Sequence, residues 1–134
     1  QIEMKFNIGG GKIQSSSSLV STTVEKPWGS YKTFEKNKDY LLKIITVNPG
    51  EKLSLQSHQH RSEQWLIISG IATVECDGTI SYLNRNESIS IPQCSKHRLS
   101  NENKEVLKVF EAQYGDKLSE SDIIRYQDEY DRVE

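Results

Sequence analysis

The stretch LSLQSHQHRSEQW, residues 53–65, gathers an amide, two imidazoles and a carboxylate within a few positions. Gln56, His58 and His60 alternate with other residues, so in a β-strand all three side chains leave the same face. Glu63 follows, and the residues after it are nearly all apolar. Polar side chains that face inward are unfavourable unless they are paired or bind something. Because neutral imidazole and carboxylate suit Zn²⁺ and similar ions, this stretch predicts a metal site.

The flanking sequence predicts an all-β domain. Short segments rich in Ile, Val, Leu, Thr and Tyr recur every ~8 to 12 residues, which is typical of an antiparallel sandwich or barrel. The pair Asp77-Gly78 predicts a two-residue hairpin turn. We expect about eight or nine strands that close into a roll whose mouth holds one small ligand. The segments are residues 31–35, 40–47, 52–60, 64–70, 71–76, 79–83, 88–92, 96–101 and 106–113.

The two ends of the chain differ from this pattern. Residues 1–23 are rich in Gly and Ser and carry no sustained period, which predicts a flexible lead-in or linker before a domain at 24–134. The segment SESDIIRYQDEYDR opens with Ser119 and has Asp122 three residues later, which resembles a capping box. We therefore expect a short C-terminal helix on the outside of the roll.

Composition limits the partners. The chain has 134 residues, enough for one domain with a core, and its net charge of −2 gives no electrostatic reason to bind nucleic acid. No run approaches the roughly 20 apolar residues that span a bilayer, and no secretory signal is visible. Cys76 and Cys94 form neither a disulfide framework nor a zinc-site spacing. We expect a cytoplasmic protein without nucleic-acid or membrane partners.

The spacing of the opening stretch resembles the cupin superfamily. The first cupin motif is usually written G(x)5HxH(x)3-4E(x)6G, and every interval fits when it is laid on Gly50, Gln56-x-His58, Glu63 and Gly70. Gln56 then stands in the place of the first His. The resemblance implies a double-stranded β-helix, or jelly-roll barrel, with a metal inside.

A second motif, usually written G(x)5PxG(x)2H(x)3N, fits further along the chain. Its positions fall on Asn86, Pro92-x-Cys94, His97 and Asn101. Asn and Cys replace the two glycines of this motif, which are turn positions. The motif therefore still offers His97 as a ligand.

The resemblance leaves two metal-ligand sets open. The set that the spacing favours is Gln56, His58, Glu63 and His97. The competing set is His58, His60, Glu63 or Gln64, and His97. In the first set, His60 stays free for the substrate or for proton transfer.

A narrower resemblance is to the type II phosphomannose isomerase cupin, a module that often forms the C-terminal part of bifunctional mannose-1-phosphate guanylyltransferases. It covers about residues 25 to 132, and its Gln-x-His supports the ligand set with Gln56. The chain departs from that family at three positions: Gln64 replaces a usual His, Cys94 a usual Gly, and Lys26 a frequent Arg. The segments that carry the resemblance are EKPWGSY at 25–31, PGEKLSLQSHQHRSEQW at 49–65, IPQCSKHRLSN at 91–101 and FEAQYGDKLSESDIIRYQDEY at 110–130.

The implied reaction interconverts mannose 6-phosphate and fructose 6-phosphate through an enediol. It needs a base, a Lewis acid such as Zn²⁺ or another divalent cation, and cations for the phosphate. His60 is the preferred proton carrier because an imidazole titrates in the right range. Glu111 is the alternative, since it alternates with Leu107 and Val109 on a face that points inward if the strand is buried. The cations proposed for the phosphate are Arg98, Lys26, Lys43 and Arg125.

Two other functions compete with the isomerase. A non-catalytic cupin that binds a sugar or a sugar phosphate is favoured by Gln64 and Cys94. An Fe(II) dioxygenase is disfavoured by the amide at Gln56, because such sites prefer three imidazoles. By analogy with cupins, which often pair through edge strands, we also expect a homodimer.

Overall fold

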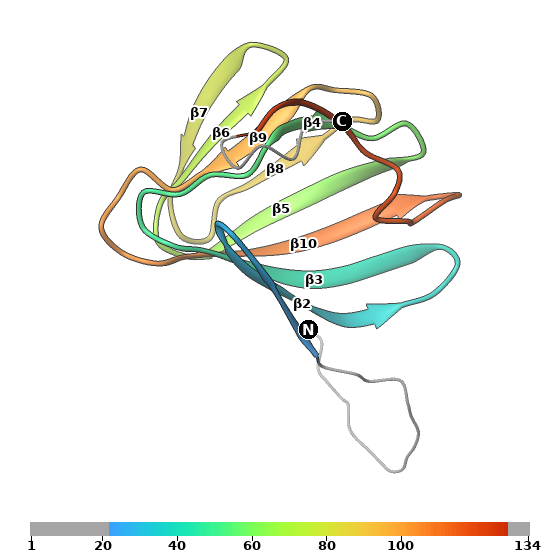
Figure 1. The fold of residues 1–134 in the computed structure, drawn as a ribbon, viewed down its shortest axis with the longest axis horizontal. Helices are drawn as coiled ribbons and strands as arrows, with labels where there is room; N and C mark the ends of the chain where they lie inside the picture. The colour runs from blue at the N-terminus through green and yellow to red at the C-terminus, as the bar shows by residue number, and fades with distance from the viewer. Residues whose placement is uncertain (1–21, 129–134) are drawn as a thin grey trace.

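The computed structural model describes residues 22–128, and this part of the chain contains two antiparallel sheets and no helix. Figure 1 shows the two sheets facing each other as a roll, which is the all-β architecture predicted from the sequence. The larger sheet contains, in spatial order, β1 (Thr23–Lys26), β2 (Gly29–Lys36), β3 (Tyr40–Val47), β10 (Leu107–Gly115), β5 (Arg61–Ser69) and β8 (Ser88–Ile91). The smaller sheet contains β11 (Ile124–Gln127), β4 (Leu55–Ser57), β9 (His97–Ser100), β6 (Ala72–Cys76) and β7 (Thr79–Leu83).

Most of the predicted segments form strands. The hairpin at Asp77-Gly78 joins β6 to β7, and both turn residues have the positive φ, 48° and 86°, that a type I′ turn requires. The segment predicted over 52–60 is an exception, because β4 ends at Ser57 and the chain bends at residues 59–60. That bend decides which side chains of the opening stretch share a face.

The prediction of a C-terminal helix is wrong for the described part of its segment. The backbone N–H of Asp122 donates to the carbonyl of Ser119 at 3.0 Å in a turn, and β11 follows and pairs with β4. The Asp122 carboxylate accepts hydrogen bonds from the backbone N–H groups of Gln59 and His60. It therefore caps the bend after β4 and does not cap a helix. Residues 1–21, which are all but the last two of the predicted lead-in, lie outside the described residues. The last part of the predicted helix, at 129–134, also lies outside them.

The three central strands of the larger sheet change from apolar to charged along their inward faces. Strand pairing puts this change at the same level in all three strands, because Lys43 of β3 lies opposite Glu111 of β10, and Glu111 lies opposite Trp65 of β5. One end of the roll is therefore an apolar core, in which each large side chain stabilises the fold by about 1.5–3 kcal/mol. The other end is lined by charged groups. The core includes Ile45, Val47, Ile67, Val74, Leu99, Leu107 and Val109.

Four motif positions at turns have a left-handed backbone. φ is 79° at Gly50, 89° at Gly70, 74° at Asn86 and 69° at Cys94. The turns therefore keep the glycine-like conformation although Asn86 and Cys94 carry side chains. The backbone N–H of Cys94 donates to the carbonyl of His58 at 2.8 Å, which ties this turn to the end of β4.

Candidate active site

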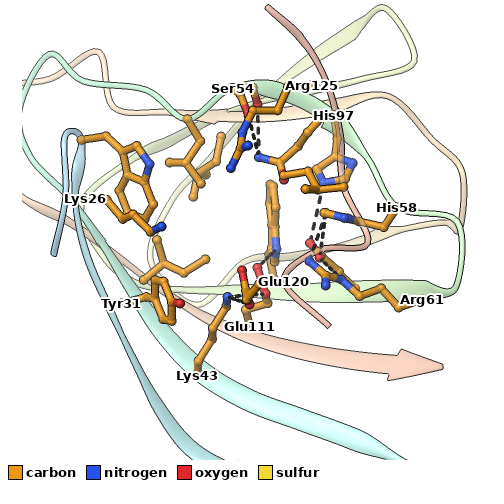
Figure 2. Close-up of a pocket in the computed structure, with 18 residues that line it drawn as sticks. Lys26, Tyr31, Lys43, Ser54, His58, Arg61, His97, Glu111, Glu120 and Arg125 are labelled. Carbon is orange, nitrogen blue, oxygen red and sulfur yellow. Dashed lines mark hydrogen bonds and ion pairs between the residues drawn. The ribbon is translucent and has the colours of Figure 1, made fainter. Parts of the chain in front are cut away.

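A pocket lies at the charged end of the roll and encloses about 620 Å³, including its open mouth. Figure 2 shows His58 and His97 on one side of the pocket, Lys26 on the opposite side, and Lys43 and Arg125 between them. The polar side chains that line it are Lys26, Tyr31, Lys43, Ser54, Gln56, His58, Arg61, Glu63, His97, Glu111, Glu120 and Arg125.

His58, Glu63 and His97 converge on one wall of this pocket. Each offers one ligand atom, and these atoms all lie within 4.8 Å of one another. Glu63 Oε2 is 3.3 Å from His58 Nε2, and Glu63 Oε1 is 3.7 Å from His97 Nε2. All three side chains are buried. Two imidazole nitrogens and a carboxylate at these distances form a group that could hold a metal ion.

Backbone carbonyls orient both imidazoles. His58 Nδ1 donates to the carbonyl of Asp122 at 2.7 Å, and His97 Nδ1 donates to the carbonyl of Ser95 at 3.0 Å. The Nε2 atom of each ring then faces Glu63, and carbonyl partners of this kind orient metal-ligating histidines. Burial and the nearby guanidinium of Arg61 lower the pKa of His58 to about 4. The ring is therefore neutral near pH 7, as metal binding requires.

Gln56 lies beside this group. It is opposite His97 in the pairing of β4 with β9, and it lines the same pocket. Its amide nitrogen donates to the carbonyl and the hydroxyl of Ser54, at 3.3 Å and 3.2 Å. The four residues of the favoured ligand set are thus gathered in one pocket, and their donor chemistry fits a divalent cation.

His60, predicted as the proton carrier, is not among the residues that line the pocket. Its side chain is 40% exposed, and its Nδ1 is 3.9 Å from the exposed carboxylate of Asp116. The reason is the bend after β4, which Asp122 holds through the N–H groups of Gln59 and His60 at 3.0 Å and 2.9 Å. His60 therefore does not follow His58 into the pocket, as it would in a continuous strand.

Arg98 and Gln64 also point away from the pocket. Arg98 follows the inward His97 on β9, and its guanidinium donates to the carbonyls of Leu53 and Gln127 at 2.9 Å and 3.1 Å. Gln64 follows the inward Glu63 on β5 and is exposed, with its amide oxygen accepting from the hydroxyl of Ser90 on β8. The departure from the family at position 64 thus lies on the outer surface.

Glu111 lies in the pocket, as its alternation with Leu107 and Val109 predicts. Its carboxylate accepts from Trp65 Nε1 at 2.9 Å and from Gln113 Nε2. Burial and the negative charge of Glu63 raise the pKa of Glu111, although Lys43 opposes them. A buried carboxyl with a raised pKa is suited to general acid–base catalysis.

Lys43 is buried beside Glu111. Its Nζ is 3.7 Å from Glu111 Oε2 and 3.3 Å from Glu120 Oε2, and it lies 4.1 Å from the centre of the Tyr31 ring. Burial alone would lower the pKa of Lys43, but the carboxylates of Glu111 and Glu120 outweigh it and the net direction is upward. Lys43 therefore stays charged in the pocket.

Arg61 and Glu120 are pocket residues that the sequence analysis missed. Arg61 Nε donates to Glu63 Oε2 at 2.9 Å, and Arg61 Nη2 donates to His58 Nε2 at 3.2 Å. The period of a strand could have identified Arg61, since it lies two residues before Glu63 and so shares its face. Glu120 enters from a turn, where no periodicity marks it.

A roll of two antiparallel sheets with inward His and Glu side chains at one end defines a cupin. Solved structures share this fold: an RmlC-like cupin from Shewanella frigidimarina has a TM-score of 0.66 at 15% identity over 79% of this chain and 92% of its own. The capsular polysaccharide assembling protein CapF from Staphylococcus aureus has a TM-score of 0.72 at 16% identity, over 82% of this chain and 35% of its own.

The chain belongs to the family described as Mannose-6-phosphate isomerase C-terminal, whose model matches residues 14–128. It is 46% identical over 110 residues to the alginate biosynthesis protein AlgA of Pseudomonas putida, and the aligned region covers 82% of this chain and 23% of AlgA. It is 44% identical over 114 residues to a mannose-1-phosphate guanylyltransferase of Escherichia coli, which covers 85% of this chain and 24% of that protein. The chain thus spans about a quarter of the length of these relatives. No helix in the described range could span a membrane.

Proposed function

We propose that this chain is the isomerase module of a sugar-phosphate enzyme and interconverts mannose 6-phosphate and fructose 6-phosphate. The observation that carries the proposal is that a single pocket joins a metal-ligand group, a buried carboxylate and several cations. Membership of the Mannose-6-phosphate isomerase C-terminal family supports the choice of substrate. The relatives named as mannose-1-phosphate guanylyltransferases support a role beside that activity in mannose metabolism.

A divalent cation would be held by Gln56, His58, Glu63 and His97. These nitrogen and oxygen donors suit Zn²⁺, and the reaction has no redox step that would call for another metal. When bound, such an ion supplies Lewis acidity to the carbonyl and hydroxyl oxygens of the sugar.

Glu111 is the proton carrier in this proposal, in place of His60. Its carboxylate takes the proton from C2 of the open-chain aldose. The electrons of that C–H bond form the C1–C2 double bond of the enediol, and the π electrons of the C1 carbonyl move onto O1. The proton returns to C1, while the hydroxyl proton of O2 passes to O1, so the ketose forms with no net change in atoms. Trp65 and Gln113 hold the carboxylate in place during both transfers.

The phosphate is bound by cations away from the metal-ligand wall. Lys26 lies on the opposite side of the pocket from His58 and His97, with Lys43 and Arg125 between (Figure 2). The phosphate of a six-carbon substrate can therefore lie among these cations, with C1 and C2 toward the wall of His58 and His97. Four cationic side chains face three carboxylates among the lining residues, which favours an anionic substrate.

A coupled assay that converts mannose 6-phosphate to fructose 6-phosphate tests the proposal. We expect activity that a chelator removes and Zn²⁺ restores, and a fall of about 100- to 10,000-fold in kcat for Glu111→Gln. The matched control is Glu105→Gln, an exposed carboxylate outside the pocket, which should keep wild-type activity. A folded, zinc-loaded chain that gave no turnover would instead indicate a cupin that only binds sugar phosphates.

A further inference from the structure

Glu120 gives Lys43 a second carboxylate partner. Glu111 reaches Lys43 from the neighbouring strand of the same sheet, and their side chains are only 4% and 7% exposed. This first pair is therefore a fixed part of the pocket wall. Glu120 approaches Lys43 from the turn before β11, and its side chain is 59% exposed. Its carboxylate can leave Lys43 for water without becoming more buried.

The charge of Glu120 is stabilised by the cations that the proposed function assigns to the substrate. Burial on its own would raise the pKa of Glu120, but Lys43 and Arg61, with a smaller contribution from Lys26, lower it overall. Glu120 is thus ionised at neutral pH and interacts with three of the pocket's cations. A substrate phosphate would seek the same charges.

The backbone on both sides of Glu120 is held independently of its side chain. The carbonyl of Ser119 accepts from Arg61 Nη1 at 3.2 Å. The carbonyl of Asp122 accepts from His58 Nδ1, and its carboxylate caps the bend after β4. The Glu120 side chain can therefore swing away from Lys43 while the turn itself stays in place.

We propose that Glu120 is a specificity-determining residue whose carboxylate occupies the anion site until a phosphorylated substrate displaces it. The inference rests on the proposed function only in taking the cations around Lys43 as the phosphate site. A neutral hexose offers Lys43 no replacement for Glu120, so it gains nothing from entering. A phosphate dianion replaces the negative charge of Glu120 beside Lys43 and carries one further negative charge, so it can compete with Glu120 for Lys43.

Glu120→Gln tests this role, because the amide keeps the shape and removes the charge. Binding of inorganic phosphate is measured by titration calorimetry, with wild type and variants in the same metal-loaded state. We expect Glu120→Gln to lower the Kd for phosphate about two- to fivefold, as expected for loss of a competing, partly exposed ion pair. Glu105→Gln removes the same charge from an exposed loop outside the pocket and should leave the Kd unchanged.

A second readout uses the unmodified chain and so does not depend on how the variant folds. The ¹³Cδ resonance of Glu120 should move during a phosphate titration, since its carboxylate leaves Lys43, while that of Glu105 should stay. An unchanged Kd in folded Glu120→Gln, or a Glu120 resonance that does not respond while phosphate binds, would overturn the inference. Isomerase activity is not part of either readout. A chain that lacks turnover but shows both effects would therefore refute the reaction and leave this role of Glu120 standing.

Discussion

Replacing Lys43 by Met should destabilise the fold in a way that depends on pH. Lys43 Nζ is 3.7 Å from Glu111 Oε2, and both side chains are buried. At an effective dielectric constant of about 20, this separation corresponds to an attraction of about 4 kcal/mol. Removal of one partner from a buried ion pair typically costs about 3–5 kcal/mol, because the other charge stays buried. We expect Lys43→Met to lose that much free energy of unfolding at pH 8.

The pH dependence follows from the direction of the pKa shift at Glu111. Its pKa in the folded chain is already above the ordinary value of 4.5, chiefly because of burial, and Lys43 is the main opposing charge. Without Lys43 the folded pKa rises further, so the folded state holds a proton that the unfolded state releases. Stability then falls as pH rises from 4.5 through the folded pKa. At lower pH a larger fraction of the Glu111 carboxyl is protonated in Lys43→Met, so the loss should be smaller at pH 5 than at pH 8.

Urea unfolding at pH 5 and pH 8, followed by the fluorescence of the buried Trp28 and Trp65, measures both values. The control is the double variant Lys43→Met/Glu111→Gln, in which a neutral amide replaces the stranded carboxylate. It should recover most of the loss at pH 8, since neutral replacement of a whole buried pair is often tolerated. A loss below about 1 kcal/mol at pH 8, or equal losses at both pH values, would refute the reasoning.

Three further predictions concern the metal, a turn and an outward position. A hundredfold excess of Zn²⁺ over its Kd should stabilise the chain by about 2.7 kcal/mol and raise Tm by about 10 °C in calorimetry. His97→Ala should abolish this shift in Tm, and an unchanged shift would exclude His97 as a ligand. Cys94→Gly should stabilise by about 0.5–1 kcal/mol in urea, because it relieves a side chain at φ 69°, whereas Asn86→Gly should change little; destabilisation by Cys94→Gly would argue against strain. Gln64→Ala should leave kcat within about twofold in the coupled assay, and a large loss would mean that Gln64 acts in the pocket.

The motif intervals were sufficient to predict that His58, Glu63 and His97 lie close together. Spacing fixes how many residues separate one turn from the next, so it brought together His58, which follows β4, and His97, which begins β9. Period-two alternation likewise placed Glu111 on the inward face of β10. Both signals are local counts along the chain, and neither depends on contacts between distant side chains.

Two of the failures, the C-terminal helix and the placing of His60 in the pocket, came from one long-range contact. Ser119 and Asp122 have the residue types and spacing of a helix cap, but the Asp122 carboxylate binds the N–H groups of Gln59 and His60. Because of that contact, the carboxylate is not available to cap a helix in its own segment, where β11 forms instead. The same contact holds the bend that keeps His60 out of the pocket. Neither segment alone contains this information, because each half of the contact looks like an ordinary polar residue.

The departures from the family carry less weight than residue type alone suggests, because their effect depends on the face they occupy. Glu63 points inward as a ligand candidate, so in a strand its neighbour Gln64 must point outward whatever residue stands there. The alternation of side chains along a strand could have shown this from the sequence alone. Cys94 differs, since its backbone keeps φ 69° and its N–H still binds the carbonyl of His58. The cost of that substitution therefore falls on stability, through strain in the turn, and the geometry of the pocket is preserved.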